Sequence, residues 1–276
     1  MSADLHVHTT FSDGTQTPAE VISLAKQVGL TTVAITDHDV VNGIEPAKIK
    51  GQELGVEIIP GIELTSETKE AEVHILGYFI GINSPELLRV IKKIQNGRKD
   101  RIIAMCTRLQ ELGIDLKADK VFQLAANDAP GRPHVARALV DGGFVAGFKE
   151  AFDKYIEFHG PAYVPHYKLS PEEAIALVLK SGGLPVFGHP AVSNCDEIIP
   201  DLRAAGLVGI EAHYFTHSAS QTEHYLKLAK DNGLLVTGGS DYHGFSSGRE
   251  VRLGSVDVPD ACVEDLKNEY IRRNKS

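Results

Sequence analysis

The sequence predicts an α/β fold in which helices cover a sheet of parallel strands. Short β-branched segments alternate with amphipathic helical segments along most of the 276 residues, and this alternation is typical of parallel pairing through helical crossovers. The chain is 42% hydrophobic and 24% charged, as in a globular protein of one or two domains. The pattern alone leaves two architectures open, a doubly wound open sheet and a barrel.

The N-terminal segments begin this alternation with a strand at residues 4–7. Thr17 and Glu20 then form a capping box around Pro18 at the first helical position, and Gly29 is the residue type that commonly ends a helix. The segments that follow have the same character. We expect strands at 32–36, 56–64 and 73–79, and a helix at 43–54.

Residues 85–160 interrupt the alternation, because they contain no convincing strand pattern and a long helical pattern covers 86–112. We therefore predict a helical insertion at 85–160 within a main domain formed by residues 1–84 and 161–276. After the insertion we expect strands at 163–164, 184–187, 207–212, 234–237 and 252–258, and helices that begin near 170, 220 and 261.

Composition and charge exclude several classes of protein. The net charge of −9 argues against a broad surface for duplex DNA, although a local basic pocket can still bind phosphate. No apolar run approaches the roughly 20 residues of a membrane span, and the N-terminus has no signal-peptide core. The separated cysteines Cys106, Cys195 and Cys262 indicate reduced thiols. We therefore expect a cytoplasmic protein with no membrane partner.

Histidines and acidic residues gather where the predicted strands end. His6 and His8 end the first strand, and their rings share one face because side chains alternate along a strand. The carboxyl ends of parallel strands meet on one face of an α/β fold. Nine candidate metal ligands follow from this placement: His6, His8, Asp13, His38, Glu63, His74, His189, Asp241 and His243.

Such a cluster predicts a site for divalent metal ions. Converging imidazoles and carboxylates make a poor protein core unless an ion lies between them. Without nearby cysteine, these ligands suit Zn²⁺, Mn²⁺ or Fe²⁺ rather than Ca²⁺ or an iron–sulfur cluster. Nine ligands are too many for one ion and fit two or three, an arrangement that favours displacement at phosphorus.

Six motifs stand in order along the chain: DLHVHTTFSDG at 4–14, ITDHD at 35–39, PGIE at 60–63, VHILG at 73–77, GHP at 188–190 and GSDYH at 239–243. Together they resemble the PHP (polymerase and histidinol phosphatase) family of metal-dependent phosphoesterases. The resemblance implies a distorted (β/α)7 barrel rather than an open sheet. It also implies a site for up to three metal ions at one mouth of that barrel.

Within the family, the chain is most similar to the branch that hydrolyses nucleoside 3′,5′-bisphosphates and trims short RNA from the 5′ end. Three features carry this similarity: Asp13-Gly14 after the first motif, the early helical insertion, and GRPHVAR at 131–137. The similarity implies a first metal held by His6, His8, Glu63 and Asp241. It implies a second held by Glu63, His74 and His189, and a third held by Asp13, His38 and His243.

The resemblance also implies roles for residues that contact the substrate. Arg132 and His134 would contact phosphate beneath a cap formed by the insertion, although the alternative is that Arg132 only begins a helix that His134 caps. Lys168 and His166 would face the same cleft, the alternative being a solvated loop. The catalytic candidates are Asp13, His243 and Arg132.

Arg98, Lys99 and Arg101 lie in the long helical pattern of the insertion. They would guide RNA if they faced the cleft. We instead expect an exposed charged face, because runs of charge on helices are usually solvated.

The function expected from the sequence is metal-dependent hydrolysis of nucleotide phosphomonoesters, with a small nucleotide or a short single-stranded RNA as substrate. Three alternatives stay open: a histidinol-phosphate phosphatase, a metal-dependent amidohydrolase, and a PHP module that binds metal without catalysis. The second lacks a suitable lysine on a middle strand, and the third conflicts with nine filled ligand positions. The sequence predicts no particular oligomeric state.

Overall fold

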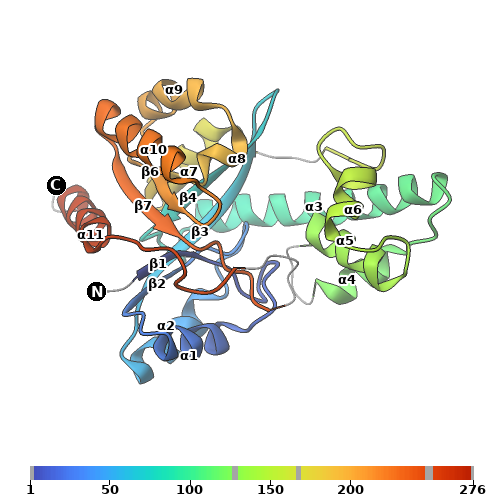
Figure 1. Ribbon diagram of the computed structural model, residues 1–276, viewed down its shortest axis with the longest axis horizontal. Helices are drawn as coiled ribbons and strands as arrows, with labels where there is room; N and C mark the ends of the chain where they lie inside the picture. Colours follow the sequence, from blue (N-terminus) through green and yellow to red (C-terminus); the bar gives the residue numbers. More distant parts are fainter. Residues whose placement is uncertain (1–2, 126–129, 166–168, 246–250, 275–276) are drawn as a thin grey trace.

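The computed structural model describes residues 3–125, 130–165, 169–245 and 251–274. Its seven described strands form one mixed sheet that curls into a nearly closed barrel surrounded by helices (Figure 1). The barrel implied by the resemblance is therefore confirmed, and the open sheet is excluded. Within the described ranges, no helix has both the length and the apolar character that a membrane crossing requires. The cytoplasmic location stays a prediction.

The elements follow the predicted order closely. The strands are β1 (Ala3–Val7), β2 (Thr32–Ile35), β3 (Glu57–Glu67), β4 (Glu72–Tyr78), β5 (Leu184–Phe187), β6 (Gly209–Tyr214) and β7 (Leu235–Gly239). The helices before β5 are α1 (Pro18–Gln27), α2 (Ile44–Leu54), α3 (Pro85–Glu111), α4 (Ala118–Leu124), α5 (Arg132–Asp141), α6 (Phe148–Ala151), the π-helical η1 (Phe152–Ile156) and α7 (Pro171–Lys180). Those after β5 are α8 (Pro190–Ser193), the 3₁₀ turn η2 (Asp196–Ile198), α9 (Ile199–Ala204), α10 (Ala219–Asn232) and α11 (Asp260–Asn274).

The strands lie side by side in chain order, from β1 to β7. The barrel closes where β1 meets the segment after β7, through a parallel bridge between Val7 and Tyr242. Gly239 permits this approach, because a Cβ there would lie only 2.4 Å from the Cβ of His6. Closure therefore brings the first and last sequence motifs together, although they stand at opposite ends of the chain.

The expected parallel pairing is wrong at one strand, because β4 runs antiparallel to both β3 and β5. The link at residues 68–71 is a tight turn in which the N–H of Thr68 donates to the carbonyl of Ala71 (2.9 Å). So short a link cannot form the crossover that parallel strands require. The reversal places the N-terminal part of β4, which carries His74, at the mouth where the parallel strands end.

Two other expected strands, at 163–164 and 252–258, are irregular segments in the structure. The carbonyl of Tyr163 accepts from the Arg108 side chain, and that of Val164 accepts from Arg101 Nε (2.6 Å), so side chains rather than a neighbouring strand satisfy them. In the second segment, the N–H of Gly254 donates to Asp4 Oδ2 (2.9 Å). Apolar and β-branched composition alone did not distinguish these segments from sheet strands.

The helices α4, α5 and α6, with η1 and the C-terminal half of α3, have a hydrophobic core of their own beside the barrel (Figure 1). The helix α3 connects the two cores. Leu87 and Ile91 near its start pack in the barrel core, whereas Met105 and Leu109 near its end pack against α4 and α5. The second core thus begins inside α3, and the predicted domain boundaries at 85 and 160 stay a prediction.

We predict that Leu109→Ala lowers the free energy of unfolding by about 2–5 kcal/mol, because Leu109 is fully buried in the second core. Leu112→Ala, at the C-cap that follows the same helix, is the matched control, since that side chain is 48% exposed. The control should cost no more than about 0.5 kcal/mol. Urea unfolding measures both, and equal losses for the two variants would contradict a separate packed core.

Candidate metal centre

The carboxylate of Glu63, a buried residue of β3, lies at the centre of the site. Both of its oxygens face imidazole nitrogens that arrive from several strands. Its Oε2 is 3.1 Å from His8 Nε2 and 3.2 Å from both His6 Nε2 and His38 Nδ1, and its Oε1 is 2.5 Å from His74 Nδ1 and 3.0 Å from His189 Nε2. One acidic side chain therefore joins five imidazole rings.

Asp241, which follows β7, supplies a second carboxylate beside Glu63. Its Oδ1 lies 3.1 Å from His8 Nε2 and 3.5 Å from His6 Nε2, while its Oδ2 accepts a hydrogen bond from the Tyr214 hydroxyl (2.8 Å). The hydroxyl fixes the orientation of the carboxylate toward the two histidines. The ligand atoms of His6, His8, Glu63 and Asp241 lie within 4.8 Å of one another, close enough to hold one ion.

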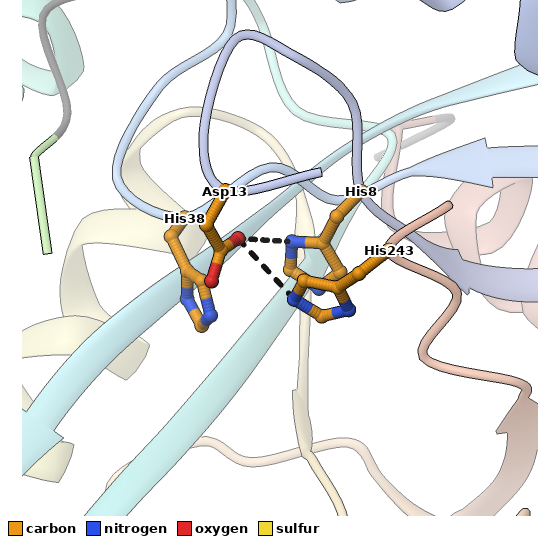
Figure 2. Close-up of side chains that lie close together, drawn as sticks. All are labelled: His8, Asp13, His38 and His243. Atoms are coloured by element: carbon orange, nitrogen blue, oxygen red, sulfur yellow. Dashed lines mark ion pairs between the residues drawn. The ribbon is translucent and has the colours of Figure 1, made fainter. Parts of the chain in front are cut away.

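Asp13 forms a neighbouring group with His8, His38 and His243, again with ligand atoms within 4.8 Å of one another. Figure 2 shows its carboxylate facing the rings of His8 and His243, with His38 beside it. The Asp13 Oδ1 atom is 3.2 Å from His243 Nε2 and 3.7 Å from His8 Nδ1. A third such group consists of His38, Glu63 and His74.

The loop that carries Asp13 is held by a second acidic residue, Asp37. The buried Asp37 carboxylate accepts from the Thr9 N–H (2.7 Å), the Thr9 hydroxyl (2.7 Å) and the Ser12 hydroxyl (2.6 Å). The Asp37 carboxylate therefore accepts hydrogen bonds from the loop that carries Asp13 and does not take part in the metal-ligand groups. Its place in the ITDHD motif reflects this positioning role.

Strained backbone marks the mouth of the barrel. Asp39 (φ 51°), His189 (φ 28°) and Asp241 (φ 52°) all adopt positive φ values that residues with a Cβ rarely adopt. Each directly follows or belongs to a motif at a strand end. Such conformations persist where surrounding contacts over-determine them, which is typical of sites where side chains must point in one direction.

The charges of the cluster shift its pKa values in opposite directions. Burial raises the pKa of a carboxyl, yet the imidazoles of His38 and His74 outweigh it, so the pKa of Glu63 lies well below its usual range. Burial lowers the pKa of His74, but the Glu63 carboxylate outweighs burial and raises that pKa to about 9. For His38, burial prevails and holds the pKa well below its usual value. A metal ion must therefore displace protons from part of the cluster.

The donor atoms of this cluster fit divalent ions. His8 Nε2, Asp13 Oδ1 and His38 Nδ1 are buried and have no hydrogen-bond partner among the described residues, although each has an oppositely charged neighbour. Buried polar atoms are normally satisfied. Imidazole nitrogen and carboxylate oxygen are ligands for Zn²⁺, Mn²⁺ and Fe²⁺, so ions would satisfy these atoms.

The structure brings all nine predicted ligands together at one mouth of the barrel. Arg132 and His134 also lie at its edge, on the first turn of α5. Arg132 Nη2 donates to Glu72 Oε1 (2.8 Å), and His134 Nδ1 accepts from the Gly131 N–H (3.1 Å). His134 therefore has the capping contact that was the alternative interpretation. His166 and Lys168 lie outside the described residues, and their roles stay predictions.

The expected exposed charged face on α3 is wrong for Arg98 and Arg101, and Lys99 is half-buried. Arg98 and Arg101 are both buried, with 7% and 5% of their surface exposed, and both line the cleft beside the cluster. Arg98 forms an ion pair with Asp39 and donates to the Thr65 hydroxyl (3.0 Å). The α3 helix passes close to the barrel mouth, and a charge pattern in one helix could not reveal that.

Glu211 is a member of the site that the sequence analysis missed. It is fully buried in β6, where its Oε1 is 3.0 Å from His6 Nδ1 and its Oε2 accepts from the His189 N–H (2.8 Å). It therefore fixes two of the imidazole positions from behind. The available signal was a single acidic residue inside the apolar strand segment GIEAHY.

Comparison with known proteins supports the assignment of this chain as a phosphoesterase. A family model described as the PHP domain matches residues 4–163. The 3′,5′-nucleoside bisphosphate phosphatase of Chromobacterium violaceum is 32% identical over 94% of this chain and 93% of its own length. The phosphoribosyl 1,2-cyclic phosphate 1,2-diphosphodiesterase of Eggerthella lenta is 31% identical (88% and 95%), and the 5′-3′ exoribonuclease Rnm of Escherichia coli is 32% identical (87% and 84%).

Solved structures agree in fold. A metal-dependent phosphoesterase of Bifidobacterium adolescentis has a TM-score of 0.88 at 32% identity, over 96% of this chain and 94% of that one. A C. violaceum protein, described as an amidohydrolase with bound sulfate and no metal, has a TM-score of 0.89 at 31% identity (97% and 96%). Fold and centre together define a metal-dependent phosphoesterase. The chain belongs to the PHP family, as its motifs implied.

We predict that Glu211→Gln weakens divalent metal binding about 10- to 100-fold, because the partner of a histidine ligand sets its orientation and basicity. Metal content after dialysis against Mn²⁺ buffers of graded concentration measures the affinity. Glu57→Gln at the start of β3 is the control, since Glu57 pairs with Lys267 at the surface. Unchanged metal affinity in Glu211→Gln would contradict a role for Glu211 in holding His6.

Proposed function

We propose that this protein hydrolyses phosphomonoesters of nucleotides, and that its preferred reaction is removal of the 3′-phosphate from nucleoside 3′,5′-bisphosphates. Short single-stranded RNA, trimmed from its 5′ end, is the second proposed substrate. Two or three divalent ions, Mn²⁺, Zn²⁺ or Fe²⁺, would occupy the centre. The relatives named as a bisphosphate phosphatase and as exoribonucleases support this choice of substrate.

The observation that carries the proposal is the sharing of residues among the three ligand groups. Two groups share His8, two share Glu63 and two share His38. Ions held in groups that share residues would lie close to one another, as hydrolysis at phosphorus requires. The nine residues predicted from the sequence are the proposed ligands. Eight of them make up the three groups, and the ninth, His189, joins the group around Glu63 because its Nε2 lies 3.0 Å from Glu63 Oε1.

Different residues of this chain would hold the metal ions, orient the ligands and face the substrate. Divalent ions, when bound, neutralise charge on phosphate oxygens and supply hydroxide from water near neutral pH. Glu63 and Asp241 hold the imidazoles of His6 and His8 in place through the contacts described above. Asp13 and His243 face the cleft side of the cluster, where a phosphate ester would enter.

Arg132 would orient the substrate from the insertion. Its guanidinium lies in the cleft that also contains His38 and His74, and Glu72 fixes it by an ion pair. A guanidinium matches phosphate oxygens with two parallel hydrogen bonds, so Arg132 would select phosphate position rather than perform the cleavage. The insertion would then act as a cap over the metal centre.

Three alternatives require separate consideration. A histidinol-phosphate phosphatase would use the same metal cluster, so only substrate comparison separates it from the proposal. An amidohydrolase is disfavoured, because none of the seven described strands contains the lysine that such a site needs. The enzyme names of the relatives also disfavour a module that only binds metal.

We predict that the Mn²⁺-loaded protein hydrolyses adenosine 3′,5′-bisphosphate with a kcat/KM at least about 10-fold above that for histidinol phosphate, because buried arginines favour a second phosphate. Phosphate release measured on both compounds gives the ratio. The cyclic phosphate that names the E. lenta relative belongs in the same panel. A preference for either of the other two compounds would refute the proposed substrate.

Asp13→Ala and His243→Ala should each abolish turnover while the protein stays folded. We expect kcat to fall at least about 100-fold, since losing even a partner of a metal ligand costs 10- to 100-fold. His224→Ala is the control, because His224 pairs with Asp196 at the surface away from the cluster. Circular dichroism checks the fold, and near-normal turnover in either site variant would remove that residue from the centre.

A further inference from the structure

The strand β6 contains a bulge between Glu211 and His213, where its register with β7 shifts. In a regular strand, residues three positions apart point to opposite faces, so Glu211 and Tyr214 would face opposite sides of the sheet. Here both reach the metal centre: Glu211 contacts His6 Nδ1, and the Tyr214 hydroxyl donates to Asp241 Oδ2 (2.8 Å). A bulge re-aims a side chain in this way, so the register shift brings Tyr214 to the side of the cluster.

The Tyr214 side chain is buried, and other rings pack against it. The centre of its ring lies 5.2 Å from the ring centres of both His189 and His217, and 4.8 Å from that of Phe215. His217 is itself held, because its Nδ1 donates to the carbonyl of Ala212 (2.9 Å). The hydroxyl therefore extends from a ring that its neighbours keep in one place.

Backbone contacts fix the position of Asp241 but not the orientation of its carboxylate. The Tyr242 N–H donates to the carbonyl of His6 (3.3 Å), and the Tyr242 carbonyl accepts from the His8 N–H (2.8 Å). A side chain on such a backbone can still rotate about its own bonds. The Tyr214 hydroxyl holds Oδ2, and Oδ1 then lies 3.1 Å from His8 Nε2.

Glu63, the other buried carboxylate of the centre, presents its oxygens differently. Its Oε2 faces the His8 ring, and its Oε1 faces the His189 ring. In Asp241, by contrast, Oδ1 faces the histidines and Oδ2 accepts from the tyrosine. The two carboxylates thus differ in how many oxygens they direct toward the histidines.

We propose that Tyr214 is a positioning residue of the metal centre, whose hydroxyl holds Asp241 Oδ2 so that Oδ1 is the oxygen offered to an ion. Asp241 would then serve one ion, whereas Glu63 is shared between ions. This inference rests on the proposed metal centre and extends it to a residue that is no ligand. Losing the partner of a metal ligand commonly weakens metal binding about 10- to 100-fold, because the ligand loses its orientation.

Mn²⁺ binding by Tyr214→Phe tests the proposal. Phenylalanine keeps the ring between its aromatic neighbours and removes only the hydroxyl. Equilibrium dialysis of metal-free protein against graded Mn²⁺ should show a dissociation constant for one ion per chain that rises at least about 10-fold. At limiting Mn²⁺, kcat for adenosine 3′,5′-bisphosphate should fall while KM stays within about twofold, and excess Mn²⁺ should restore turnover.

Tyr225→Phe is the matched control. Tyr225 is also buried, and its hydroxyl also donates to a carboxylate, Asp196 Oδ1 (3.2 Å), which belongs to none of the ligand groups. Each variant loses one bond between a tyrosine and a carboxylate, so a purely structural role would affect both alike. The Mn²⁺ affinity of Tyr225→Phe should stay within about twofold of wild type.

Circular dichroism of the metal-free proteins checks that both variants fold. Equal weakening of Mn²⁺ binding in the two variants, or wild-type affinity in Tyr214→Phe, would overturn the proposal.

Metal binding and substrate turnover fail independently. If wild-type protein hydrolysed neither adenosine 3′,5′-bisphosphate nor short RNA, yet Tyr214→Phe alone lost Mn²⁺ affinity, the proposed reaction would fail and the role of Tyr214 would stand. If wild-type protein hydrolysed the bisphosphate while Tyr214→Phe bound Mn²⁺ normally, the reaction would stand and the role of Tyr214 would fail. Wild-type protein that bound no Mn²⁺ would overturn both.

Discussion

The contact between the Glu63 carboxylate and five surrounding imidazoles organises the whole mouth of the barrel. A buried carboxylate is costly unless its charge is compensated, and here histidines from several strands provide that compensation. The cost makes the cluster dependent on positive charge, either protons on the rings or divalent ions. Glu211 contacts His6 from behind, and Asp37 holds the first loop through its hydrogen bonds, so buried polar groups support the cluster from outside it.

The barrel and the helical insertion meet at the same place. The α3 helix packs in the barrel core at its start and in the second core at its end, and Arg98 between them pairs with Asp39, the neighbour of His38. The strained Asp39 backbone is therefore held by the insertion as well as by the barrel. Because both units line the cleft, a change in the insertion alters the surroundings of the substrate without touching the metal ligands.

A metal centre on the barrel, beside a cleft that the insertion also lines, accords with the different activities named for proteins of similar sequence. A bisphosphate phosphatase, a cyclic phosphate diphosphodiesterase and an exoribonuclease are each about one third identical to this chain over most of its length. A shared metal centre would supply the common chemistry at phosphorus. Differences in reaction would then depend on the groups around the centre, and here the arginines of α3 and α5 line the cleft beside it.

The sequence by itself determined the order of the seven described strands, the helical stretch that follows the fourth of them and the nine residues of the cluster, because each depends on local periodicity, caps and short motifs. The same local patterns also predicted strands at 163–164 and 252–258, which do not form. Tertiary structure decided what local pattern cannot encode. The tight turn before β4 reversed that strand and brought His74 to the mouth. The path of α3 buried Arg98 and Arg101, and closure of the barrel placed Glu211 of β6 behind His6 of β1. The partners of Arg98 and Glu211 stand far away in the chain, so only the packed fold could bring each pair together.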